Sequence, residues 1–143
     1  MTAKEYLSQA YHIDCMIRSK QEQSQLYYDI ATKMNAPLSD MPTGATSNVH
    51  WIEDAICALV DLKDAINADL RALVEAKRDI TETINNVGDP TYRTLLELRY
   101  LCYKPWAEIA SLLKYEHRYI FKLHDKALRE VDTKRHLKTP KDT

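Results

Sequence analysis

Apolar side chains recur through the first 88 residues at alternating steps of three and four, which places them on one face of a helix. A first stripe holds apolar or small residues with two polar interruptions: Tyr6, Ala10, Ile13, Ile17, Lys20, Ser24, Tyr27, Ala31 and Met34. A second stripe holds nine aliphatic residues and two lysines: Ile52, Ile56, Leu59, Lys63, Ile66, Leu70, Leu73, Lys77, Ile80, Ile84 and Val87. A 3.5-residue spacing kept over about five heptads is typical of a coiled-coil seam, so the pattern predicts two long helices.

The ends of these two stretches carry helix signals. Thr2 and Glu5 have the spacing of a capping box, in which both side chains accept hydrogen bonds from backbone N–H groups of the first turn. Pro37 and Gly44 mark a loop between the two stripes. We therefore expect a long antiparallel helical hairpin, coiled-coil-like, over residues 1–88.

Additional apolar residues lie beside the stripes: Leu26, Trp51, Val60 and Leu62. A hairpin of two helices covers only one side of each helix, so these side chains would stay in water in a monomer. We therefore predict that the hairpin is a dimerisation module and that the protein is a homodimer. The alternative is that these residues pack against the C-terminal part of the same chain.

The sequence around Gly88 predicts a domain boundary. Gly88 suits the left-handed conformation that closes a helix, and Asp89 followed by Pro90 suits the cap and first turn of the next helix. We expect a second domain over residues 89–143, so that the fold is all-α, with the hairpin followed by a small helix-turn-helix domain.

The second domain has the apolar pattern of a helix-turn-helix. A helix is expected from Tyr92 to Leu101, and Lys104-Pro105 separates it from the next one. The diagnostic core positions are occupied by Ile109, Ala110, Leu113, Tyr115, Ile120 and Leu123. Lys114 stands at the turn, where glycine is usual because the residue tends to adopt a positive φ. The alternative is an ordinary helical hairpin with the same spacing.

Glycine is scarce, with 2 residues in 143, where average usage would give roughly ten. Sheet-rich folds and glycine-rich phosphate loops are therefore not expected. No apolar run has the length of a membrane span, and the N-terminus does not resemble a signal peptide. Three widely spaced cysteines are expected to be buried thiols in a reducing compartment, and we expect the protein to be cytoplasmic without membrane contact.

Charge is distributed unevenly between the two predicted domains. Residues 1–88 contain 8 Lys and Arg against 13 Asp and Glu, whereas residues 89–143 contain 12 against 8. The basic second domain is therefore expected to bind a polyanion, and its helix-turn-helix pattern makes double-stranded DNA the expected partner.

Helical geometry then separates two groups of candidate DNA-binding residues. The base-reading candidates, on a recognition helix over about 116–131, are Glu116, His117, Arg118, Phe121, Lys122 and Asp125. The phosphate-contact candidates are Lys104, Lys114, Lys126, Arg129, Lys134 and Arg135. Arg118 suits a bidentate contact with guanine, and Phe121 suits contact with a thymine methyl group.

Nothing in the sequence indicates an enzyme. The five histidines, His12, His50, His117, His124 and His136, have no metal-binding spacing, and no nucleophile motif is present. We expect no catalytic residue, cofactor or metal. The alternative to a DNA-binding regulator is a protein–protein adaptor, which would use the same scaffold to bind a partner such as RNA polymerase.

Three segments carry a resemblance to known families: Leu95–Leu101 (LLELRYL), Trp106–Ala110 (WAEIA) and Lys122–Leu128 (KLHDKAL). They resemble region 4 of bacterial sigma factors, the helix-turn-helix that reads the promoter −35 element. The whole chain resembles the small phage and prophage proteins grouped with the RinA and ArpU late-gene transcriptional activators.

The resemblance implies a sequence-specific regulator of phage genes, of the activator type, with host RNA polymerase as a further candidate partner. By position, it places DNA-reading roles on His117, Arg118, Phe121 and Lys122. Sigma factors usually carry several arginines on this face, whereas this chain has Glu116, Tyr119 and Phe121. A standard −35 sequence is therefore not expected as its target.

Overall fold

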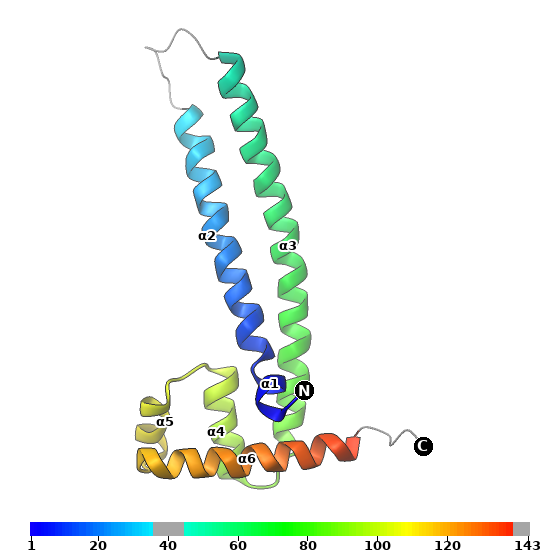
Figure 1. The fold of residues 1–143 in the computed structure, drawn as a ribbon, viewed down its shortest axis with the longest axis vertical. Coiled ribbons are helices and arrows are strands. Elements are labelled where there is room, and N and C mark those ends of the chain that lie inside the picture. Colours follow the sequence, from blue (N-terminus) through cyan, green and yellow to red (C-terminus); the bar gives the residue numbers. More distant parts are fainter. Residues whose placement is uncertain (36–44, 139–143) are drawn as a thin grey trace. The chain divides into compact units, whose positions relative to one another are not determined.

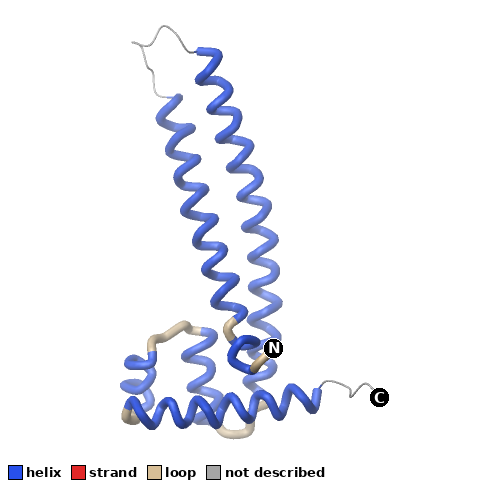
Figure 2. The backbone as a smooth tube through the Cα atoms, in the orientation of Figure 1, coloured by secondary structure: helices blue, strands red, loops and turns tan. Residues whose placement is uncertain are grey.

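The computed structural model describes residues 1–35 and 45–138, and all of the regular structure in these ranges is helical (Figures 1 and 2). The helices are α1 (Ala3–Leu7), α2 (Gln9–Asn35), α3 (Ala45–Asn85), α4 (Pro90–Leu96), the π-helix η1 (Glu97–Leu101), α5 (Trp106–Leu113) and α6 (His117–Lys138). The all-α class is therefore confirmed. The expected loop residues Pro37 and Gly44 lie outside the described residues.

The N-terminal cap has the predicted hydrogen bonds. The Glu5 N–H donates to the Thr2 hydroxyl at 3.2 Å, and the Thr2 N–H donates to the Glu5 carboxylate at 3.4 Å. The long first helix predicted from this cap is, however, interrupted at Ser8. Ser8 is the C-cap of α1, where its hydroxyl and its N–H both donate to the Lys4 carbonyl, at 2.6 and 3.0 Å.

The chain divides into two compact units, which differ from the predicted domains. One unit is Ile13–Ala72, and the other combines Met1–His12 with the chain from Leu73 onward. The expected boundary at Gly88 therefore lies inside the second of these units. The reason is hydrophobic burial, because the short C-terminal helices share their core with both ends of the predicted hairpin.

In the unit Ile13–Ala72, α2 and α3 lie side by side (Figure 1). The ammonium of Lys20, one of the polar interruptions of the first stripe, donates a hydrogen bond to the Asp69 carboxylate across the two helices. Ile17, Ala31 and Ala55 are buried in this unit. The contact between the helices is thus made by small side chains and an ion pair as well as by aliphatic residues.

The second stripe is not buried along its length as a continuous coiled-coil seam would be. Ile56 is 48% exposed and Leu70 is 42% exposed, so these two members of the stripe lie in solvent. Two helices in contact can cover only one face of each other, and the apolar surface of α3 extends beyond the face that α2 covers.

The other unit has a single hydrophobic core drawn from its two chain segments. The buried residues are Ala3, Leu7, Ala10, Ile80, Ile84, Val87, Leu95, Leu96, Tyr100, Ile109, Ala110, Ile120, Leu123, Ala127 and Val131. This core holds α1, the end of α3, α4, η1, α5 and α6 together. It fixes the relative positions of the C-terminal helices that carry the predicted binding residues.

The connection after α3 differs from its prediction at one residue. Asp89 caps α4 by accepting a hydrogen bond from the Thr91 N–H at 2.8 Å, and Pro90 occupies the first turn, as expected. Gly88, in contrast, does not have the predicted left-handed conformation. Its N–H instead donates to the Glu130 carboxylate of α6 at 2.7 Å, so a tertiary contact holds the connection.

Two further expectations are corrected by the structure. The helix predicted from Tyr92 to Leu101 is α4 followed by η1, whose widened turn is seen where the Cys102 N–H donates to the Glu97 carbonyl. The cysteines Cys15, Cys57 and Cys102 are exposed rather than buried. Among the helices at residues 1–35 and 45–138, none is long and apolar enough to cross a membrane.

Candidate nucleic-acid interface

The candidate interface begins at the turn between α5 and α6. Lys114 follows the last residue of α5 with φ 59° and ψ 41°, which is the left-handed conformation predicted for this position. The N–H groups of Lys114 and Tyr115 both donate to the Ala110 carbonyl, and these two hydrogen bonds close the helix. The prediction that a lysine occupies the glycine-like position of the turn is therefore confirmed.

Burial on one side of α6 determines which of its residues face outward. Ile120, Leu123, Ala127 and Val131 are buried and pack with Ile109 and Ala110 of α5 in the same core. The pattern of three- and four-residue steps is that of one helix face. The opposite side of α6 is left open to solvent.

All six base-reading candidates lie on or beside this open side. Each of them is exposed: Glu116, His117, Arg118, Phe121, Lys122 and Asp125. His117 begins α6, and the N–H groups of Tyr119 and Ile120 donate to the Glu116 carbonyl at 3.0 and 3.1 Å. The structure thus brings the six residues together on the first turns of one helix.

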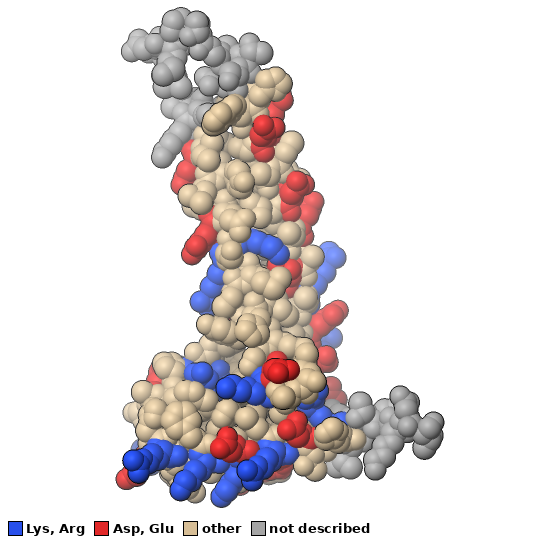
Figure 3. Space-filling model, in the orientation of Figure 1, with Lys and Arg blue, Asp and Glu red and all other residues tan. Residues whose placement is uncertain are grey.

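Basic residues form a stripe along the same helix. Arg118, Lys122 and Lys126 follow one another at four-residue steps and Arg129 comes three residues later, so they lie on successive turns. All four are exposed, and Figure 3 shows Lys and Arg side chains gathered along α6. We call these four residues the basic stripe; at 1.5 Å per residue it extends over about 16 Å.

The remaining phosphate-contact candidates differ in their exposure and in the contacts that their charged groups already make. Lys114 is exposed at the turn, and Lys134 is half-buried. The Lys104 ammonium is paired with the Glu108 carboxylate at 3.2 Å. The Arg135 guanidinium lies 4.3 Å from the centre of the Tyr6 ring and donates to the Met1 carbonyl at 3.4 Å. Arg135 therefore has a structural contact with the N-terminal segment.

Aromatic side chains contact one another around the first turns of α6. The Phe121 ring lies 5.4 Å from the Trp106 ring and 5.1 Å from the His117 ring, measured between centres. The Tyr115 and Tyr119 rings are 5.0 Å apart in an edge arrangement. Because Phe121 is held between two neighbours, its exposed edge has a defined position on the helix surface.

The role of His124 was not predicted from the sequence. This residue is buried, its Nε2 atom is hydrogen-bonded to the Tyr100 hydroxyl at 2.6 Å, and its ring lies 4.6 Å from the Trp106 ring. Its position four residues after Ile120 places it on the inward face of α6, and that periodicity was the available signal. His124 ties α6 to η1 and α5.

The environment of the Tyr100–His124 pair keeps both side chains uncharged at neutral pH. Burial lowers the pKa of His124 to about 4; the Asp125 carboxylate acts in the opposite sense, and the cations Lys4 and Arg99 lower the pKa further. Burial raises the pKa of Tyr100 to about 12, partly offset by the Arg99 charge. The pair is therefore a neutral hydrogen bond in the core.

The described side chains include no group of three or more His, Cys, Asp or Glu residues that could hold a metal ion. The family described as a protein of unknown function (DUF1492) matches residues 39–132, which include α4, η1, α5 and most of α6. No curated protein and no solved structure matches the chain.

Proposed function

The chain belongs to the phage-associated DUF1492 family, and we propose that it is a sequence-specific, double-stranded DNA-binding regulator of phage or prophage transcription. In this proposal α5 and α6 are the two helices of a helix-turn-helix that resembles sigma factor region 4. The observation that carries the proposal is the left-handed turn at Lys114, which presents an exposed basic face of α6 directly after it.

The basic stripe supports a position of α6 in the major groove. The major groove of B-form DNA admits an α-helix, and the first turns of such a recognition helix contact base edges. Arg118 lies in the first turn and suits bidentate donation to guanine N7 and O6. Phe121, one turn later, suits contact with a thymine methyl group.

The other candidates have assigned roles in the same arrangement. His117 and Lys122 reach base edges or the nearest phosphates, while Glu116 and Asp125 suit acceptance of a hydrogen bond from cytosine N4. The proposed phosphate contacts come from Lys104, Lys114, Lys126, Arg129, Lys134 and Arg135. Such contacts fix the orientation of the protein without selecting a sequence.

We further propose that the protein is a homodimer and that α2 and α3 form a dimerising hairpin. Leu26 is 63% exposed, Trp51 60% and Val60 53%, which is the exposure that the sequence predicted for a monomer. Leu62, predicted to be exposed with them, is half-buried. A second copy would cover this apolar surface and bring two reading helices to a two-fold symmetric site.

A second candidate function is that of an adaptor that binds a protein such as RNA polymerase without reading DNA. It is favoured by exposed apolar surface near the turn, where Leu112 is 54% exposed, Tyr115 41% and Tyr119 44%. Clustered exposed aromatic residues are common in protein interfaces.

One experiment separates the two functions. The full chain is titrated against a random-sequence duplex at several salt concentrations. Added cations compete with the protein for the phosphates, so binding through phosphate contacts weakens steeply as the salt concentration rises. A DNA-binding protein loses affinity with a log–log slope of several units, whereas an adaptor shows no binding at low salt. Selection of bound duplexes from a random pool then gives the target sequence, and an enriched palindrome supports the dimer. Failure to enrich any sequence contradicts the proposal of specific reading.

A further inference from the structure

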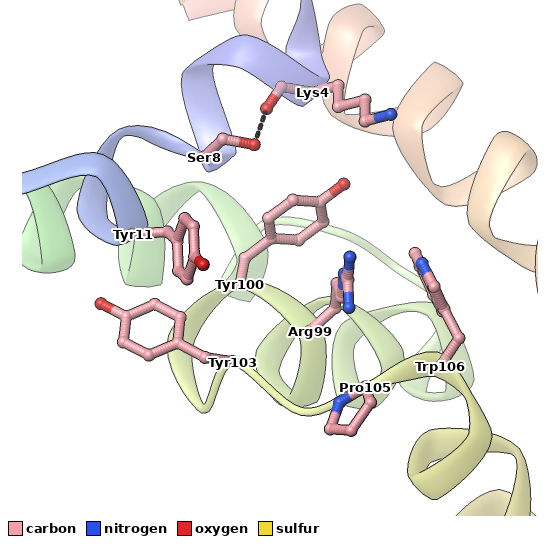
Figure 4. A pocket seen from close by; sticks show the side chains of 8 residues that line it. All are labelled: Lys4, Ser8, Tyr11, Arg99, Tyr100, Tyr103, Pro105 and Trp106. Carbon is pink, nitrogen blue, oxygen red and sulfur yellow. Dashed lines mark hydrogen bonds between the residues drawn. The ribbon is translucent and has the colours of Figure 1, made fainter. Parts of the chain in front are cut away.

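A pocket of about 360 Å³ lies in the unit that carries α6, and it shares no residue with the DNA-binding candidates. Its lining comes from α1, the start of α2, η1, the following loop and the start of α5 (Figure 4): Lys4, Ser8, Tyr11, Arg99, Tyr100, Tyr103, Pro105 and Trp106. Half of these residues are aromatic and two are cationic. None of the eight is acidic.

Aromatic side chains lie at both ends of the pocket and between them. Tyr11 and Tyr103 lie together at one end, with ring centres 5.5 Å apart, and Trp106 lies at the other end with Tyr100 between them (Figure 4). Tyr103 has a positive φ of 59°, which is unusual for a bulky residue. The Tyr11 and Tyr103 rings meet edge to face, and the Lys77 ammonium lies over the Tyr103 ring at 5.1 Å. Aromatic side chains at both ends of a pocket favour a planar ring as ligand, since stacking is insensitive to the identity of the ring.

The pocket has two cations: Arg99 lies between Tyr100 and Trp106, and Lys4 comes from α1 (Figure 4). Both cations line the same pocket as Tyr100 (Figure 4). The Arg99 guanidinium is oriented by donation to the Lys104 carbonyl at 3.0 Å and by the Trp106 ring at 4.5 Å. One such bond uses only part of its five N–H donors, and the others remain suited to a phosphate.

We propose that this pocket binds a small aromatic anion of the nucleoside monophosphate class, with the base against the tyrosines and the phosphate beside Lys4 and Arg99. The volume argues for one nucleotide rather than a longer strand, because small-molecule pockets begin at about 300 Å³. Lys4, Ser8 and Tyr11 lie outside the family-matched residues 39–132. The ligand thus joins a segment outside the family match to the matched helices η1 and α5.

The position of Trp106 allows a direct measurement. A Trp51→Phe background removes the other tryptophan, so that fluorescence reports on Trp106 alone. AMP, GMP, CMP and UMP are titrated separately into this protein. We expect at least one of them to give a saturable change, together with a rise in melting temperature, because a ligand that binds only the folded state stabilises it.

Two comparison compounds separate the contributions of ring and phosphate. Adenosine lacks the anion and ribose 5-phosphate lacks the ring, and each is expected to bind about tenfold or more weakly than the best nucleotide, the loss typical of one charged or stacked contact. Equal binding of ribose 5-phosphate would make this a plain anion site and would overturn the proposal. A lack of saturable change with all four nucleotides would overturn it too.

Lys4→Gln provides the mutational test, since Lys4 is exposed on α1 and the change leaves its backbone bond with Ser8 intact. Nucleotide affinity is expected to fall about tenfold. Lys63→Gln, an equal change of charge on an exposed residue of α3, is the matched control and retains full affinity. Duplex DNA binding is expected to persist in Lys4→Gln, so the pocket and the DNA-binding proposal are tested separately. Unchanged nucleotide affinity in Lys4→Gln contradicts the assignment.

Discussion

The hydroxyl oxygen of Tyr100 lies 2.6 Å from Nε2 of His124, and this hydrogen bond connects η1 to α6 inside the core. Both side chains are buried, and neither is charged at neutral pH. The bond therefore fixes α6 relative to the preceding helices without the desolvation of an ion. The bond lies on the inward side of α6, opposite the exposed residues of the proposed DNA-binding face.

Acid is expected to destabilise the protein through His124. Its pKa is about 4 in the folded chain and about 6.5 when unfolded, so the unfolded state takes up the proton first. The contribution of neutral His124 to the free energy of unfolding is fully present above about pH 6.5. It is lost as the pH falls toward 4, and the loss amounts to roughly 3 kcal/mol at most. Urea unfolding measured at several pH values tests this. His124→Gln is expected to show a shallower decline, and an identical decline in both proteins would contradict the assignment.

Tyr100→Phe should destabilise the fold without changing its shape. The substitution removes the hydroxyl and leaves the buried His124 nitrogen without this partner, at a cost of about 1 to 3 kcal/mol. Chemical denaturation measures the difference. Tyr92→Phe, which alters a half-buried tyrosine of α4, is the matched control and should cost less.

Lys114→Gly should stabilise the turn. Left-handed backbone costs a non-glycine residue about 1 kcal/mol, and glycine adopts it freely. The free energy of unfolding is therefore expected to rise by about that amount. Lys114→Ala removes the same charge but keeps the strained Cβ, so it should give no such gain. If both variants had the same stability, strain at this turn would not be the cause.

Arg118→Ala and Lys126→Ala should affect DNA binding differently. Loss of the proposed guanine contact is expected to cost about 1 to 3 kcal/mol on the selected duplex and to relax the preference at one position. Loss of a phosphate contact should weaken all duplexes alike and reduce the salt slope by about one unit. Binding to the selected duplex and to its single-base variants is measured for both proteins. Equal behaviour of the two would contradict the proposed docking of α6.

The proposed homodimer is expected to depend on the exposed apolar face of α3. Val60→Glu adds a charge to this face and should shift the protein to a monomer at tens of micromolar in sedimentation experiments, since burial of an unpaired charge is costly. Ala68→Glu adds the same charge to another exposed face of the helix and should leave the dimer intact. A monomeric parent protein at this concentration would contradict the dimer directly.

The local features of the sequence predicted much of the secondary structure. The Thr2 and Glu5 cap, the Asp89 and Pro90 helix start, and the left-handed turn at Lys114 all depend on residues within a few positions of each other. The outward face of α6 could also be predicted, because the inward positions follow from helical periodicity alone. Short-range physics is sufficient for features of this kind.

The predictions from local sequence that were wrong concern features that depend on tertiary contacts. Gly88 was expected to be left-handed, yet its N–H is held by Glu130, which lies 42 residues away. Residues 1–12 were assigned to the hairpin but share a core with the C-terminal helices, and the stripe residue Ile56 is exposed. The Tyr100–His124 bond likewise joins distant positions. The sequence by itself determined where helices begin, end and turn; only the packed structure decided which surfaces they bury, because burial depends on partners that local spacing does not specify.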